Sequence, residues 1–373
     1  MKIGVARRAA AAVGLSLVLL IAGCGGGGQP EGNAAKSANA AGNTASNGGT
    51  VGGEPTLRIQ TSFYPMYEFT KQVAGDLATV ELLVPGGVEP HDWEPSPQDI
   101  RNLTESDLLI VNGAGMESWL EQVEASTTNG KPEIVEASEG ITLMEGGEEE
   151  EHAHEEEHGH EAEEPADDAH HADEEEHAAD HEGNAEEAAH GHEHDHDHGG
   201  LDPHVWLSPA LAVQEVRNIE AALTKVDPEH ADQYKHNADA YAAQLEQLDR
   251  DFREGLANAK RKDFITQHAA FGYLAQEYGL TQVPIAGLSP DQEPSAAQMT
   301  EIVKFAEEHQ VKTIFFETLV SSKVAETIAR EIGAKTAVLN PIEGLTVEDE
   351  AAGRDYLSLM RQNLEALKAA LSE

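Results

Sequence analysis

The stretch "DPEHADQYKHNADAYAAQLEQLDRDFREGLANAK", residues 227–260, decides the fold. Asp227 followed by Pro228 is a favourable helix start, because proline is tolerated in the first turn. Apolar residues then recur at spacings of three and four: Ala231, Tyr234, Ala238, Tyr241, Leu245, Leu248, Phe252 and Leu256. This periodicity predicts one amphipathic helix of roughly 30 residues, about 45 Å long at 1.5 Å per residue. Such a helix is longer than an α/β crossover needs, so we interpret 227–260 as a rigid linker between two halves.

Both sides of this helix alternate short apolar strands with amphipathic helices. Before it, "TLRIQTS", "TVELLVPGG" and "DLLIVNG" read as strands of an N-terminal lobe, 56–226. After it, "DFITQ", "VKTIFFE" and "KTAVLN" read as strands of a C-terminal lobe, 261–373. Strands that alternate with helices pair in parallel. The predicted fold class is therefore α/β, with two lobes that each hold a mainly parallel sheet flanked by helices.

The N-terminus reads as an export signal. Lys2, Arg7 and Arg8 precede an apolar run, and the run is shorter than a membrane-spanning helix requires. The ending Ile21-Ala22-Gly23-Cys24 resembles a bacterial lipobox, in which the cysteine carries a lipid; the alternative is an ordinary secretory signal with a chance cysteine. Residues 25–55 are rich in Gly, Ala, Asn and Ser and read as a flexible tether. We expect an extracytoplasmic protein held to the cell membrane through Cys24, on a Gram-positive surface or on the periplasmic side.

Charge separates one segment from the rest. The formal net charge is −45, which disfavours binding to nucleic acid. Residues 148–198 contain 23 acidic residues, 13 histidines and no Lys or Arg. Because this segment has no apolar period, it cannot contribute a core, and we predict a disordered loop within the N-terminal lobe.

Six histidines lie outside that segment. His91 follows the strand "TVELLV", His268 follows "DFITQ", and His204 precedes a helix; Glu343 follows "KTAVL". Ligand sites in open α/β sheets lie at the carboxyl ends of strands. Three imidazoles and one carboxylate form a donor set typical of tetrahedral Zn²⁺. From the residues alone this signal is weak; His230, His236 and His309 lie on predicted helices and are interpreted as solvated.

Several motifs in order carry a family resemblance. They are "GVEPHDWEPSPQD", "DPHVWLSP", "TQHAAFGYLAQEYGL", "LSPDQEPSAAQM" and "AVLNPIEGLT". From about residue 56 to the C-terminus the chain resembles the cluster A-I metal-binding lipoproteins, the solute-binding proteins of zinc and manganese ABC importers. The resemblance implies two α/β lobes joined by a long rigid helix, with the metal in the cleft between them.

The resemblance also implies a ligand set. The family's three histidines fall on His91, His204 and His268. Some relatives use an aspartate as the fourth ligand, at the position of Asn340; others use a glutamate, which falls on Glu343. We favour Glu343, with water as the rival, and assign Glu89 and Glu317 to the layer that supports the ligands.

The implied function is extracytoplasmic, high-affinity capture of Zn²⁺ and its delivery to an ABC permease, without bond chemistry, by a monomer. Manganese relatives place a carboxylate where His268 stands, and three imidazoles favour zinc. The alternatives are a manganese-binding protein of the same family, a surface adhesin and a zinc hydrolase; no HExxH pair supports the last. Since the ligands must be deprotonated, affinity is expected to fall below about pH 6.5.

The histidine-rich segment is predicted to collect zinc weakly. Imidazoles spaced by two residues, His190, His192, His194, His196 and His198, can share one ion in interchangeable ways. A disordered loop loses chain entropy when it closes around an ion, so it would speed capture without setting the affinity. The alternative is a solvated acidic linker.

Overall fold

The computed structural model describes residues 57–126, 132–146 and 200–373. The predictions for the signal and lipidation site at Cys24, the tether 25–55 and the histidine-rich segment 148–198 lie outside the described residues. The described residues form one compact unit in their contacts, which includes both halves that flank the long helix.

The first sheet has four parallel strands in the order β2-β1-β3-β4. Their bounds are β1 Leu57–Thr61, β2 Ala78–Leu82, β3 Leu108–Val111 and β4 Glu133–Glu136. Three helices accompany them: α1 Tyr64–Ala74, α2 Pro97–Thr104 and α3 Leu120–Ser126. The first three strands lie where the sequence pattern predicts them. Helix α3 and strand β4 were not predicted, because segments of seven and four residues carry too few apolar positions to define a period.

The second sheet repeats this topology, with four parallel strands in the order β6-β5-β7-β8. Its strands are β5 Asp263–Thr266, β6 Thr281–Pro284, β7 Thr313–Phe316 and β8 Lys335–Val338. Its helices are α6 Gly272–Tyr278, α7 Ala296–Glu308, α8 Lys323–Ile332, α9 Val347–Ala351 and α10 Tyr356–Leu371. The edge strand β6 was not predicted; it ends in a proline, which is tolerated at a sheet edge but weakens a strand pattern. The expected α/β class with two parallel sheets is confirmed.

A helical layer also connects the two sheet regions along the chain. A 3₁₀ turn, η1 Val205–Leu207, leads into α4 Pro209–Val226; a second, η2 Pro228–His230, leads into α5 Ala231–Leu256. The long helix therefore begins four residues after Asp227 and spans about 39 Å. Asp227 does not cap it, because its Oδ2 instead accepts a hydrogen bond from the Tyr234 hydroxyl at 2.8 Å.

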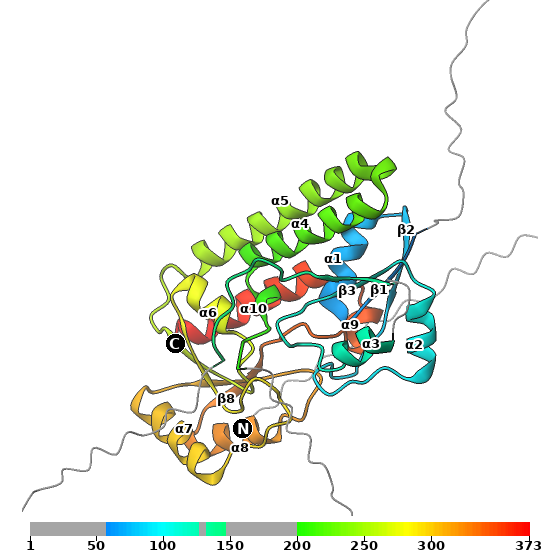
Figure 1. Cartoon of the computed structure of the whole chain (residues 1–373). Helices are drawn as coiled ribbons and strands as arrows, with labels where there is room; N and C mark the ends of the chain where they lie inside the picture. Colours follow the sequence, from blue (N-terminus) through cyan, green and yellow to red (C-terminus); the bar gives the residue numbers. More distant parts are fainter. Residues whose placement is uncertain (1–56, 127–131, 147–199) are drawn as a thin grey trace, which may run out of the picture. The chain divides into compact units, whose positions relative to one another are not determined.

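One hydrophobic core connects both sheets to this helical layer. On β3, Leu108 and Ile110 face the shared core, whereas Leu109 and Val111 face α2 and α3. On β5 and β7, Phe264 and Phe315 face the same shared core, while the neighbouring isoleucines face α7 and α8. Helix α5 packs against α4, α1 and α10, as Figure 1 shows. The two halves are thus joined by a continuous buried contact as well as by the chain.

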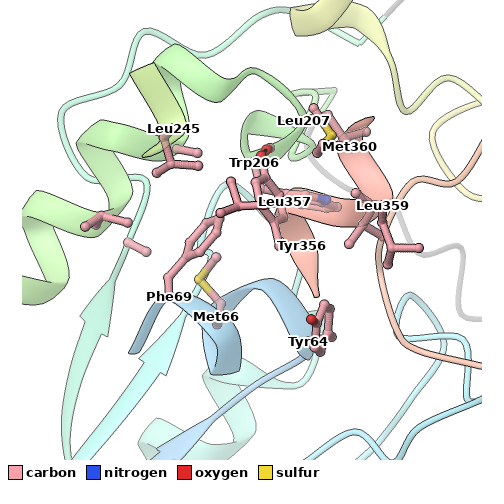
Figure 2. Packing of buried hydrophobic residues seen from close by; sticks show 14 of the residues in the cluster. Tyr64, Met66, Phe69, Trp206, Leu207, Leu245, Tyr356, Leu357, Leu359 and Met360 are labelled. Atoms are coloured by element: carbon pink, nitrogen blue, oxygen red, sulfur yellow. Dashed lines mark hydrogen bonds between the residues drawn. The ribbon is translucent and has the colours of Figure 1, made fainter. Parts of the chain in front are cut away.

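The centre of that core is aromatic. Trp206, Tyr356 and Phe69 come from η1, α10 and α1, and Figure 2 shows them packed together with Met66 and Met360. Phe69 and Tyr356 meet edge to face with centroids 5.0 Å apart, a favourable aromatic geometry. In the part of the chain that the structure describes, no helix is both long and apolar enough to cross a membrane.

Candidate metal centre

Four side chains from distant parts of the sequence meet at one point. His91 lies in the loop after β2, and His268 lies two residues after the end of β5. Glu343 lies in the loop after β8, and His204 immediately precedes η1. One ligand atom of each lies within 4.8 Å of those of the other three. All four residues are buried, with at most 2% of their surface exposed. The structure therefore brings together the four residues nominated as ligands.

The spacing of the donor atoms suits a small tetrahedral ion. The Nε2 atom of His204 lies 3.3 Å from Nε2 of His91 and 3.3 Å from Nε2 of His268. Glu343 Oε1 lies 3.3 Å, 3.5 Å and 3.3 Å from the Nε2 atoms of His91, His204 and His268. Zinc bonds to nitrogen are about 2.0–2.1 Å long, and the edge of a tetrahedron with such bonds is about 3.3–3.4 Å. These five distances match that edge, so one zinc ion fits among the four atoms without a large rearrangement.

Carboxylates orient two of the imidazoles from behind. Asp202 Oδ1 accepts hydrogen bonds from the backbone N–H of His204 at 2.9 Å and from its Nδ1 at 2.8 Å. Glu317 Oε1 does the same for His268, at 3.1 Å and 2.7 Å. A carboxylate on Nδ1 leaves Nε2 as the free donor and raises its basicity. Glu317 was expected in such a supporting position; Asp202 was not singled out.

Glu89 supports the third imidazole differently. Its Oε1 accepts a hydrogen bond from the backbone N–H of His91 at 3.1 Å. Burial, and then the nearby charge of Glu343, raise the pKa of Glu89 to about 9. Glu89 is therefore neutral near pH 7 and fixes the His91 backbone without adding negative charge to the site.

The four nominated residues form one coupled set of charges. Burial lowers the pKa of His91 to about 4, so this imidazole is neutral at pH 7. Burial opposes the charge on His268, but Glu317 and Glu343 together raise its pKa well above the usual value. Burial also opposes ionisation of Glu343, yet the neighbouring imidazoles hold its pKa well below the usual range. The pKa of His204 is likewise raised, because the hydrogen bonds that its ring donates to Asp202 and Glu343 outweigh burial.

These shifts change one expectation. If zinc were bound by the Nε2 atoms of His204 and His268, protons on these atoms would have to leave, because a ligand nitrogen needs its lone pair. With unperturbed imidazoles the affinity would fall below about pH 6.5. Since these two pKa values are raised, the loss of affinity begins at a higher pH.

The loop that carries Glu343 is held by an amide. Asn340 Oδ1 accepts a hydrogen bond from the backbone N–H of Ile342 at 2.7 Å, and Ile342 has a φ of 60°. Asn363 on α10 donates to the Asn340 carbonyl oxygen at 2.6 Å and accepts from its N–H at 2.8 Å. Asn340, where some relatives place an aspartate ligand, here stabilises a strained turn that aims Glu343 at the histidines.

A tryptophan ties this loop to the turn that carries His204. Trp206 Nε1 donates to the carbonyl oxygen of Pro341 at 2.8 Å. Its ring lies 5.2 Å from the ring of His204, centroid to centroid, and its side chain is fully buried. Trp206 therefore holds the turn of His204 and the loop of Glu343 together.

The other three histidines in the described part of the chain lie at the surface. His230, His236 and His309 are exposed, as predicted. His309 Nδ1 pairs with Asp263 Oδ2 at 3.0 Å, and His230 Nδ1 pairs with Asp227 Oδ2 at 2.6 Å. Their carboxylate partners lie at the surface too, so these pairs do not resemble the buried set.

Comparison with known proteins agrees with the site. The family model described as zinc-uptake complex component A, periplasmic (ZnuA), matches residues 59–370. The chain belongs to this family. A high-affinity zinc uptake system protein ZnuA from Bacillus subtilis (strain 168) is 48% identical over 332 residues, which cover 89% of this chain and 93% of that protein. The ZnuA family consists of solute-binding proteins of transporters and not of enzymes, so the hydrolase alternative is set aside.

Solved structures give the same relationship. A metal-dependent lipoprotein, YcdH from Bacillus subtilis, is 45% identical, with a TM-score of 0.65; the match covers 85% of this chain and all of that one, 100%. The Zn(II)-bound ZnuA-like domain of Streptococcus pneumoniae AdcA is 37% identical, also with a TM-score of 0.65, over 85% of this chain and 99% of that one. Together with the buried group of three histidines and a glutamate, the zinc-bound relative supports Zn²⁺ as the bound ion.

Proposed function

We propose that this protein is the extracytoplasmic zinc-binding component of an ABC importer, which captures Zn²⁺ and delivers it to a membrane permease. His91, His204, His268 and Glu343 hold the ion in this proposal. The observation that carries it is the set of 3.3–3.5 Å distances among their donor atoms, buried between the carboxyl ends of two parallel sheets in a ZnuA-family chain.

The charge of the site supports transient binding of a cargo. Zinc with one carboxylate and three neutral imidazoles has a net charge near +1, and Asp202 and Glu317 behind two imidazoles offset that charge. Protons can return to His204 and His268 when the ion leaves, because these two groups have raised pKa values. Without zinc, the protonated imidazoles therefore form ion pairs with Glu343, so this buried carboxylate is not left without a neutralising charge.

Metal analysis and competition test the proposal. The purified protein should contain about one tightly bound zinc per chain, and Zn²⁺ should displace Mn²⁺ because imidazoles favour zinc over manganese. His268→Ala should lose tight zinc binding, since it removes one donor and leaves Glu317 Oε1 without its imidazole partner. His309→Ala is the matched control: it removes an exposed histidine of the same half and should bind zinc as the wild type does. Preference for Mn²⁺ in the wild type would instead establish the manganese alternative.

Anchoring and delivery complete the proposal. Lipid attachment at Cys24 would hold the protein at the outer face of the cell membrane, and a permease would dock where both sheets present their ligand-bearing loops. One monomer carries all four donors, so no second copy is needed. Cys24→Ala should release the protein into the medium or periplasm without changing its zinc Kd, which membrane fractionation and chelator competition measure.

Host adhesion is a separate hypothesis with its own test. A variant that lacks zinc, such as His268→Ala, should lose transport in any case. If this variant still bound host extracellular matrix as the wild type does, adhesion would be independent of the metal site.

A further inference from the structure

Tyr273, the second residue of α6, forms hydrogen bonds with two other chain segments near His204. Its hydroxyl accepts a hydrogen bond from the backbone N–H of Met144 at 2.9 Å and donates one to the carbonyl oxygen of Asp202 at 2.7 Å. The side chain is buried, with 3% of its surface exposed. Burial raises the pKa of Tyr273 to about 12, so the hydroxyl keeps its proton across the physiological range.

The hydroxyl occupies a gap in a short antiparallel pairing. Glu145 pairs with Leu201, Gly146 N–H donates to the Gly200 carbonyl, and Asp202 N–H donates to the Met144 carbonyl at 2.9 Å. In a regular antiparallel ladder the next bond would run directly from Met144 N–H to the Asp202 carbonyl. Here the Tyr273 hydroxyl relays that bond, so the two backbones separate at Asp202.

Asp202 lies where the two backbones separate, and its side chain contacts His204. Its Oδ1 holds both the backbone and the Nδ1 of His204, as described above. Its Oδ2 lies against Gly272, where an added Cβ would stand only 2.6 Å from that oxygen. Any side chain at Gly272 would therefore push the carboxylate away from its present position. Two adjacent residues of α6 thus fix Asp202, Tyr273 from its backbone side and Gly272 from its carboxylate side.

We infer that Tyr273 and Gly272 are positioning residues for the zinc site, which act on His204 through Asp202 and couple it to α6, the helix that follows His268. This inference rests on the proposed function, because the readout is zinc bound by His204. It also assigns a role to the paired segments 144–146 and 200–202, which keep the chain that enters His204 in register with the gathered ligands.

Single substitutions give the first test. Tyr273→Phe removes only the hydroxyl and should weaken zinc binding about 3- to 10-fold, less than the 10- to 100-fold expected for a residue that contacts a ligand directly. The visible absorption of bound Co²⁺, which reports ligand geometry, should shift as well. Tyr278→Phe is the matched control on the same helix: its hydroxyl donates to Asp249 at 3.1 Å, away from the site, so Kd and spectrum should stay as in wild type. Gly272→Ala should reproduce the effect by the independent steric route.

A double-mutant cycle tests the path of action. If Tyr273 acts through Asp202, the pair Tyr273→Phe and Asp202→Asn should weaken zinc binding no more than Asp202→Asn alone. The inference is overturned if Tyr273→Phe binds Zn²⁺ within about twofold of wild type with an unchanged Co²⁺ spectrum, or if the two effects add. Failure of the proposed function would look different: the wild type itself would lack tight zinc binding, or His268→Ala would retain it.

Discussion

The buried carboxylate of Glu317, which accepts hydrogen bonds from His268, allows a quantitative prediction of zinc affinity. Glu317→Gln keeps the size of the side chain and one carbonyl oxygen but removes the negative charge. Glu317 Oε1 accepts two hydrogen bonds from His268, at 2.7 Å and 3.1 Å. The bond to the backbone N–H is the same with and without zinc, so the effect on Kd comes from the Nδ1 bond and the lost charge. Loss of a group that supports a metal-binding imidazole typically weakens affinity by about 10- to 100-fold, so zinc Kd should rise about 30-fold, which is about 2 kcal/mol at 1.4 kcal/mol per tenfold.

The size of this effect should depend on pH. Glu317 also raises the pKa of His268 in the zinc-free protein, so its charge stabilises a bound proton as well as bound zinc. Below that raised pKa the charge of Glu317 stabilises the proton in the zinc-free protein as well as the zinc complex, so its effects on Kd partly cancel. Above that pKa the extra proton is absent, and the charge stabilises mainly the zinc complex. The ratio of mutant to wild-type Kd should therefore grow as the pH rises through the raised pKa of His268.

Competition with a chromophoric chelator at several pH values measures both Kd values. Glu326→Gln is the control, because it makes the same change on the exposed surface of α8 in the same half. The reasoning fails if Glu317→Gln leaves Kd unchanged at high pH, or if the ratio shrinks as the pH rises.

Four further predictions address the protons, the core, the histidine-rich segment and motion. Zinc binding near pH 7 should release protons from His204 and His268, so calorimetric enthalpies should differ between buffers of different ionisation enthalpy; equal enthalpies would contradict the raised pKa values. Trp206→Phe should lower the free energy of unfolding by about 1–3 kcal/mol in urea titrations, because it leaves a buried carbonyl without its donor; no change would refute that role. Replacing 147–199 with Asn-Gly should close a two-residue hairpin on the paired ends and change zinc Kd by less than about threefold, and loss of tight binding would move the site into the removed segment. Zinc should slow amide hydrogen exchange in loop 83–96 more than in α5; the reverse would indicate a hinge in the long helix.

Much of the fold was accessible from local patterns. The three- and four-residue spacing of apolar side chains predicted the long helix within a few residues at each end, because burial of one face is encoded locally. Local signals also end and begin helices: Ser295 and Gln298 form a capping box at the start of α7, and Gly279 ends α6 with a φ of 63°. The missed strands β4 and β6 are short edge strands, and their pairing depends on neighbours far along the chain.

The site was predictable only in part, and for a physical reason. Histidines after strand ends can be read from sequence, but the choice of His91, His204 and His268 came from the family resemblance, since a lone histidine carries no mark of its partners. The carboxylate behind His268 is 49 residues away, at Glu317. Tyr273 was invisible as a partner of Asp202, because a hydroxyl that relays one backbone bond leaves no periodic signal.

The packing determines which part of the site can move when zinc enters or leaves. A hinge between the sheets would have to break the core that α5 and α10 share with both of them, and buried aromatic groups such as Tyr356 make that costly. His204 and His268 are fixed by buried carboxylates, and Glu343 by the Asn340 turn. His91 differs, because residues 85–88 of its loop are exposed, and the loop reaches the other half through the bond from Gly87 N–H to the Leu345 carbonyl, 2.9 Å. We therefore expect the energetically cheapest opening to be a local displacement of the His91 loop, which would expose one edge of the donor set while His204, His268 and Glu343 stay in place.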